Sequence, residues 1–152
     1  MIENGWYYSR NGYVEVHSVT DQLKPGYYFA ETNSNGQLVM MPKEMRSMSA
    51  FGMPGDQPSQ FLGKIEKFFK DAATYEAMGM SHKMGLILFG EPGIGKTTTL
   101  QKVVEWTTNV VGGLVIRMPL NTDMVSKILG TVSLRPVVFL CEDLDRFCQN
   151  GY

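Results

Sequence analysis

The residues from Gly90 to Thr97 have the types and spacing needed to hold phosphate groups. They read G-E-P-G-I-G-K-T and match G-x-x-x-x-G-K-[ST], the phosphate-binding loop of nucleoside triphosphatases. Gly93 and Gly95 let the backbone turn tightly and point its N–H groups at phosphate oxygens, because neither has a Cβ. Lys96 would reach the β- and γ-phosphates, and the Thr97 hydroxyl would ligate Mg²⁺. The sequence therefore predicts that this loop binds a nucleoside triphosphate with Mg²⁺.

The segments on either side of the loop fit this prediction. The apolar run Leu86–Phe89 is typical of a buried parallel strand, and it leads directly into the glycines. Residues 98–108 place apolar side chains at helical spacing, and the start of such a helix would favour anions. The alternative is a glycine-rich turn that matches by chance, which this context disfavours. The predicted nucleotide-binding residues are Gly90, Glu91, Pro92, Gly93, Ile94, Gly95, Lys96, Thr97 and Thr98.

A second candidate group of residues follows another apolar run. Residues 137–141 are expected to form a buried strand, which ends in Glu142-Asp143-Leu144-Asp145. Acidic side chains at such a strand end suit a Mg²⁺–nucleotide site: one carboxylate can hold the metal, while the next orients the water that attacks the γ-phosphate. The alternative is a solvated acidic turn. Following a phosphate loop in the same chain, the functional interpretation is favoured.

The remaining pattern predicts an α/β fold with a parallel sheet. An apolar stripe from Phe61 to Ala72 predicts a helix over residues 59–78, with Ser59 as its N-cap and Gly79 as its C-terminal stop. After the phosphate loop and its helix come a strand at residues 113–117 and a helix at residues 122–129. Alternating strands and helices place ligands at the carboxyl ends of the strands.

The chain divides into three predicted regions. Residues 1–41 form a small β-rich N-terminal region, with short strands separated by turn signals and with aromatic side chains that pack the sheet rather than stack on bases. Residues 42–58 form a linker rich in Pro, Gly, Ser and Met. Residues 59–152 form the phosphate-loop core, which is expected to be truncated after the acidic strand end.

Composition limits the classes of partner. The net charge of −1 gives no electrostatic case for nucleic acid or an anionic membrane. No apolar run approaches the roughly 20 residues of a membrane span, and no signal peptide is recognisable. Cys141 and Cys148 lack the pattern of a metal site. These features predict a cytoplasmic protein without a membrane segment.

The helix, the phosphate loop and the acidic strand end together resemble the opening of an AAA+ ATPase module. The family places a helix, a short connection and G-h-L-h-h-G-x-P-G-x-G-K-[ST] in this order, and the match covers about residues 59–147. Its Walker B strand ends in D-E, an apolar residue and D, whereas this chain has Glu142-Asp143-Leu144-Asp145. Aligned on Asp145, the resemblance implies that Glu142 is the metal-associated residue and Asp143 the catalytic carboxylate. Lys96 would act with them in ATP hydrolysis, and Thr97 would share the metal.

The same resemblance implies a larger machine. Complete members continue with a sensor strand, an arginine finger, a last core strand and a helical lid, none of which is recognisable in this sequence. We therefore expect the chain to be the N-terminal part of an ATPase that forms a homo-oligomeric ring and remodels a protein or nucleic-acid client. We do not expect it to hydrolyse ATP alone. A non-hydrolysing regulatory module and another P-loop NTPase or kinase remain alternatives, although no N-K-x-D element supports a GTPase.

Overall fold

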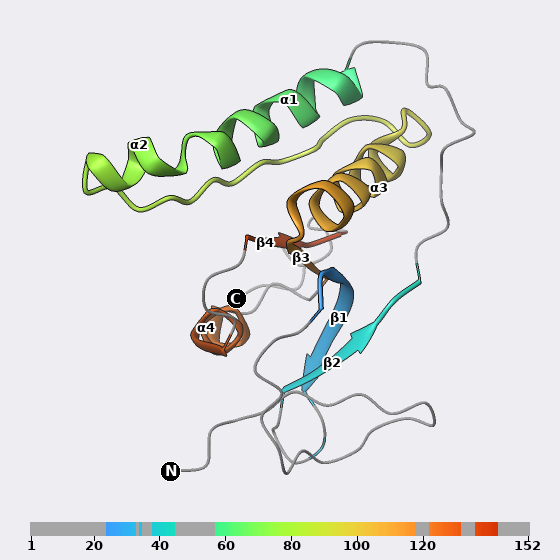
Figure 1. The fold of residues 1–152 in the computed structure, drawn as a ribbon. Coiled ribbons are helices and arrows are strands. Elements are labelled where there is room, and N and C mark those ends of the chain that lie inside the picture. The colour runs from blue at the N-terminus through green and yellow to red at the C-terminus, as the bar shows by residue number, and fades with distance from the viewer. Residues whose placement is uncertain are drawn as a thin grey trace, which may run out of the picture. The chain divides into compact units, whose positions relative to one another are not determined.

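The computed structural model describes residues 24–32, 34, 38–44, 57–117, 122–131 and 136–142, in two compact units. One unit contains the sheet, which is built from residues before position 46 and after position 106. The other contains the phosphate loop and three helices. Figure 1 labels the α-helices and strands of both units.

The first unit is a four-stranded mixed sheet in the order β2-β1-β3-β4. Its strands are β1 (Gly26–Thr32), β2 (Leu38–Pro42), β3 (Leu114–Arg117) and β4 (Val137–Leu140). The pairs β1–β3 and β3–β4 are parallel, whereas β2 runs antiparallel to β1. The predicted α/β class is confirmed. Of the four short strands expected within residues 1–41, the one at residues 27–30 forms as β1 and the one at residues 37–40 forms from Leu38 onward as β2, whereas those at residues 6–8 and 13–16 lie outside the described residues. The strands predicted at residues 113–117 and 137–141 form as β3 and β4. The sheet is mixed rather than purely parallel because the β1–β2 connection is a short hairpin, which joins antiparallel neighbours.

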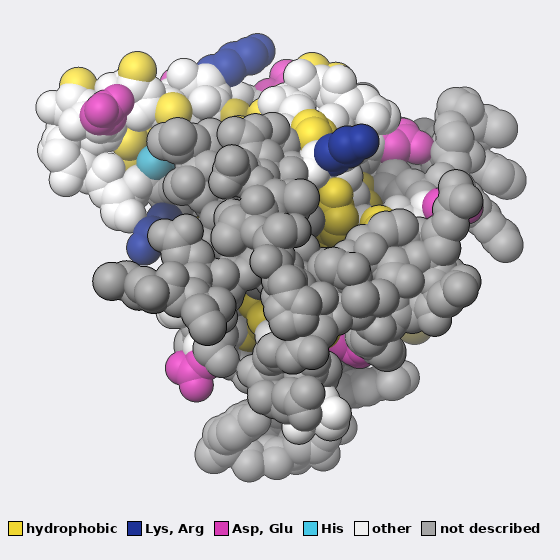
Figure 2. All heavy atoms as spheres, turned by 60° about the horizontal axis from the view of Figure 1, so that its bottom comes forward, with side chains coloured by type: hydrophobic (Ala, Val, Ile, Leu, Met, Phe, Trp, Pro, Cys, Tyr) yellow, Lys and Arg dark blue, Asp and Glu magenta, His cyan; other side chains and the backbone are white. Residues whose placement is uncertain are grey.

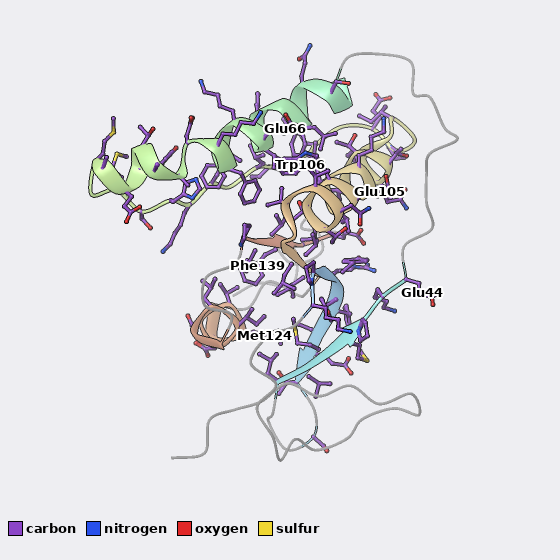
Figure 3. The ribbon with its side chains drawn as sticks, viewed as in Figure 1. Glu44, Glu66, Glu105, Trp106, Met124 and Phe139 are labelled. Carbon is purple, nitrogen blue, oxygen red and sulfur yellow. The ribbon has the colours of Figure 1, made fainter. Side chains whose placement is uncertain are left out.

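One face of this sheet carries the apolar core of the unit. Helix α4 (Thr122–Thr131) contributes Met124 and Ile128, which pack with Ile116 of β3 and with Phe139 of β4 (Figure 3). Leu114, Ile116 and Ile128 are 0% exposed. Alternate residues of a strand point to opposite faces, so Val115 lies on the other face, where it is also fully buried. The strongly apolar β3 is therefore the central element of the sheet.

The second unit packs helix α1 (Gln57–Lys70) against α3 (Lys96–Trp106). Among its described residues, Ile65 of α1 and Val103 and Val104 of α3 are the buried apolar side chains. A short turn of π-helix, η1 (Thr107–Val111), continues the chain into the first unit. The helix predicted over residues 98–108 is thus confirmed in its main part.

The helix predicted over residues 59–78 forms as two pieces, α1 and α2 (Ala72–Ala77). Ser59 is not its N-cap, because α1 begins at Gln57 and Ser59 lies inside the first turn. Pro58 explains the earlier start: its fixed φ and missing N–H suit the first turn of a helix. Gly79 ends α2 as predicted, with a φ of 65° and its N–H donated to the Glu76 carbonyl at 3.0 Å.

The strand predicted at Leu86–Phe89 is wrong. The connector, residues 79–91, has no regular secondary structure, and Ile87 and Phe89 are 73% and 88% exposed. A strand exists only where a neighbour takes up its backbone hydrogen bonds, and no such neighbour is found in the described part of the chain. The connector is held at His82 instead. That ring stacks on Phe68 at 3.9 Å between centroids, and its Nε2 donates to the Phe68 carbonyl at 2.7 Å.

None of the helices in the described part of the chain combines the length and the apolar character that crossing a bilayer requires.

The predicted divisions of the chain at residues 41 and 58 stay predictions. The structure adds that β1 and β2 share one sheet with β3 and β4, which follow the phosphate loop in sequence.

The close approach of backbone at Gly113 gives a test of the sheet unit. A Cβ at this position would lie 2.7 Å from the Pro136 carbonyl oxygen and 3.0 Å from Thr107 Cγ2. We expect Gly113→Ala to lower the free energy of unfolding by about 1–3 kcal/mol, the usual cost of overpacking. Urea unfolding followed by circular dichroism measures this change.

Gly63→Ala is the matched control. No heavy atom lies within 4 Å of a Cβ at Gly63 in α1, so the substitution should stabilise by about 0.5–1 kcal/mol through helix propensity. Equal stability of the wild type and Gly113→Ala would contradict the close approach of the Gly113 backbone to Pro136, the residue before β4.

Candidate functional site

The phosphate loop turns through three glycines in backbone conformations that other residues avoid. The φ angles are 147° at Gly90, 84° at Gly93 and 88° at Gly95. L-residues with a Cβ rarely adopt these values, so the glycine spacing of the motif matches what this backbone requires. At Gly90 the space is also limited, because a Cβ there would collide with Cδ1 of Ile94. The loop is therefore a specific structure in this chain and not a loose glycine-rich turn.

Helix α3 begins at the end of this loop with its N–H groups free. Its first residue is Lys96, and the first backbone bond of the i to i−4 type joins the Thr99 N–H to the Gly95 carbonyl at 2.9 Å. The Thr99 hydroxyl donates to the same carbonyl at 3.0 Å. The N–H groups of residues 96–98 therefore have no i−4 partner within the helix. Together with the helix dipole they form an environment that favours an anion.

The Lys96 side chain folds back over the loop. Its ammonium donates to the carbonyl oxygens of Gly90 and Glu91, each at 2.7 Å. This brace ties the first residues of the loop to the first residue of α3, and it places a positive charge within the loop. Thr97 is exposed and Thr98 half-exposed, as are the loop residues before them. A phosphate chain would reach this loop from solvent without first displacing any core side chain.

The described half of the acidic site is Glu142, just beyond β4. Its carboxylate forms a salt bridge with the guanidinium of Arg117, the last residue of β3. Parallel pairing explains this contact: Arg117 lies opposite Leu140, so the two strands end at the same edge of the sheet. The pair is half-exposed, with 42% and 32% of the two side chains accessible. Asp143 and Asp145 lie outside the described residues, so the catalytic role predicted for Asp143 is not tested.

Tyr27 of β1 completes this group at the sheet edge. Burial raises the pKa of its phenol above the ordinary value, and the negative charge of Glu142 adds to that effect. The positive charge of Arg117 and a hydrogen bond from it to the phenol oppose the shift. Neither Arg117 nor Tyr27 is among the site residues that the sequence predicts. Arg117 carried a usable signal, since it ends an apolar strand that had been predicted to run parallel to the strand before Glu142.

Comparison with known proteins gives relatives of one kind. No family model matches the chain. Over 119 residues it is 23% identical to a probable mitochondrial chaperone, BCS1-A, of Dictyostelium discoideum, covering 78% of this chain and 28% of that protein. It is 25% identical over 109 residues to a probable mitochondrial chaperone, bcs1, of Schizosaccharomyces pombe, covering 71% and 24%. A second Dictyostelium discoideum chaperone, BCS1-B, is 26% identical over 116 residues, covering 72% and 24%.

These chaperones are AAA-family ATPases, so the similarity supports the AAA+ resemblance of the sequence at low identity. The chain spans about a quarter of the length of the curated relatives that it matches. The similarity extends to the class of protein and leaves the roles of individual residues as predictions.

The Arg117–Glu142 pair can be measured by a double-mutant cycle. We expect Arg117→Met and Glu142→Gln to show a coupling free energy of about 0.2–1 kcal/mol, because a half-exposed ion pair is weakened by solvent. The measurement is urea unfolding of the wild type, both single variants and the double variant. The exposed Glu66–Lys70 pair of α1 serves as a reference, with its side chains 40% and 77% accessible. Additive effects of the two substitutions would contradict a stabilising contact between the two side chains.

Proposed function

We propose that this chain is the nucleotide-binding part of an AAA-type ATPase that uses Mg-ATP hydrolysis to remodel a macromolecular partner. One observation carries the proposal: a phosphate-loop sequence folds with three positive-φ glycines and leads directly into a helix whose free N–H groups begin at Lys96. The similarity to AAA-family chaperones supports the general class. The homo-oligomeric ring, the client and a cytoplasmic location are parts of the proposal that follow from the AAA+ resemblance and from composition.

In this proposal the loop holds the β- and γ-phosphates through backbone N–H groups. The ammonium of Lys96 exchanges its bonds to the Gly90 and Glu91 carbonyls for bonds to phosphate oxygens, which bear full negative charge and are the stronger acceptors. The exposed Thr97 hydroxyl and the Glu142 carboxylate are the groups that would hold Mg²⁺. The metal would neutralise charge on the phosphates, and Asp143 would orient the attacking water.

The salt bridge at Glu142 favours the second candidate function, a module that binds nucleotide without hydrolysing it. The Arg117 guanidinium forms a salt bridge with the Glu142 carboxylate that is proposed to hold the metal. Mg²⁺ would have to compete with this guanidinium for the carboxylate. A chain in which Arg117 kept this carboxylate would bind nucleotide through the loop and lack a complete metal site. The two candidates therefore differ in turnover and share nucleotide affinity.

Replacing Lys96 tests the nucleotide site that both candidates share. We expect Lys96→Ala to weaken Mg-ATP binding by at least about tenfold, because a charge-assisted hydrogen bond is worth about 1.5–3 kcal/mol. Isothermal titration calorimetry measures the affinity, and circular dichroism checks that α3 still folds without the brace. Lys102→Ala, farther along the same helix, is the matched control and should bind like the wild type. Equal affinities of wild type and Lys96→Ala would disprove the site.

Replacing the two acidic residues separates metal binding from chemistry. In a completed module we expect Asp143→Asn to keep nucleotide affinity and to lose turnover, since it removes the water-orienting carboxylate. Glu142→Gln should instead weaken the Mg²⁺ dependence of binding. Phosphate release and calorimetry with and without Mg²⁺ distinguish these outcomes. Retained hydrolysis by Asp143→Asn would mean that the roles of the two residues are assigned in the wrong register.

A further inference from the structure

Three neighbouring strands of the sheet unit bring Tyr27, Arg117 and Glu142 together, and all three residues belong to this one compact unit. Phe29 of β1 lies opposite Arg117 of β3, so Tyr27, two residues before Phe29, is on the same face of the sheet as Arg117. On the other side of β3, Arg117 lies opposite Leu140, two residues before Glu142. The strand register therefore places Arg117 between a phenol and a carboxylate.

The Arg117 guanidinium has a partner on each side. It forms the salt bridge with Glu142 and donates a hydrogen bond to the phenol of Tyr27. A guanidinium has five N–H donors in one plane and can serve both acceptors at once. Fixing a long side chain at one partner costs conformational entropy, and a second fixed acceptor reduces the freedom that remains to be lost. Tyr27 thus favours the arrangement in which Arg117 contacts Glu142.

The charge that balances Glu142 is local. Among the described residues the other salt bridge is Glu66–Lys70, which lies within α1. Figure 2 shows the acidic and basic side chains of the described residues as separate spots on the face that it draws, and not as one charged patch. Attraction between single charges in water falls with distance and is screened by salt. The effect on Glu142 therefore depends on where the one guanidinium of Arg117 is held.

We propose that Tyr27 is a positioning residue for the acidic site: its phenol keeps the Arg117 guanidinium on the Glu142 carboxylate, and this guanidinium must be displaced before the carboxylate can hold a metal ion. The part that concerns the metal rests on the proposed function, whereas the positioning of Arg117 does not. Strand β1 lies in the predicted N-terminal region, outside the phosphate-loop core. That region, through Tyr27, sets how readily the acidic site accepts Mg²⁺.

Nuclear magnetic resonance tests the positioning without nucleotide or metal. Rotation of the Arg117 guanidinium about its Nε–Cζ bond is measured from ¹⁵N exchange between its two Nη groups, with Arg117→Lys to identify the signals. Tyr27→Phe keeps the ring and removes the acceptor oxygen, so it should accelerate this rotation about threefold or more. Tyr28→Phe is the matched control, because its hydroxyl donates to the Lys24 carbonyl at 2.8 Å and its ring packs in the core with α4. The control should leave the rotation unchanged.

The Mg²⁺ dependence of ATP binding tests the consequence for the site. Calorimetry at several Mg²⁺ concentrations gives the concentration at which half of the metal-dependent gain in ATP affinity is reached. Removing the competing cation with Arg117→Met should lower this concentration about three- to tenfold, and Tyr27→Phe should lower it about two- to threefold. Arg117→Lys keeps the charge and should stay closer to the wild type. In the Arg117→Met background, Tyr27→Phe should have no further effect, because Tyr27 acts through Arg117.

The outcomes separate this inference from the proposed function. Unchanged guanidinium rotation in Tyr27→Phe would overturn the positioning role, and so would a Mg²⁺ shift of the same size in the Arg117→Met background. ATP binding that does not depend on Mg²⁺ in any variant would overturn both the metal part of the inference and the proposed metal site. The rotation measurement would still decide the positioning of Arg117, and the calorimetric test of Lys96 would still decide the nucleotide site.

Discussion

The site depends on a backbone that can turn back on itself between the connector and α3. Three positive φ angles within six residues are strongly disfavoured for residues with a Cβ, and glycine supplies each of them. The Lys96 ammonium then closes the turn by binding the Gly90 and Glu91 carbonyls. Backbone freedom and a single side-chain cation are therefore jointly required. The glycines create the concave loop, and the lysine keeps its first residues near the start of the helix, where N–H groups and the dipole favour the same anion.

Parallel pairing of β3 and β4 determines which side chains surround Glu142. Strands β3 and β4 are parallel, and Leu114 lies opposite Val137. Their carboxyl ends, and the residues that follow them, therefore lie at the same edge of the sheet. Arg117 and Glu142 are brought together by this constraint although the chain between them includes a whole helix. The edge gathers a cation, a carboxylate and the Tyr27 phenol, whose pKa is raised by burial. In the proposed function, a metal ion entering there would meet a carboxylate that already has a partner, so its affinity would depend on Arg117 as well as on Glu142.

Sequence reasoning succeeded where structure is decided locally. The apolar stripe of α1, the φ of Gly79, the glycine spacing of the loop and the short apolar strands β3 and β4 all depend on residues within one turn or one strand. It failed where the structure depends on contacts between residues that are distant in the sequence. Leu86–Phe89 has the composition of a buried strand, yet among the described residues no neighbouring strand takes up its backbone hydrogen bonds. The acidic residues beyond Glu142 lie outside the described part, so their roles still depend on the family pattern. The pairing of β1 with β3, across most of the described chain, had no local signal, and neither did the contact between Arg117 and Tyr27.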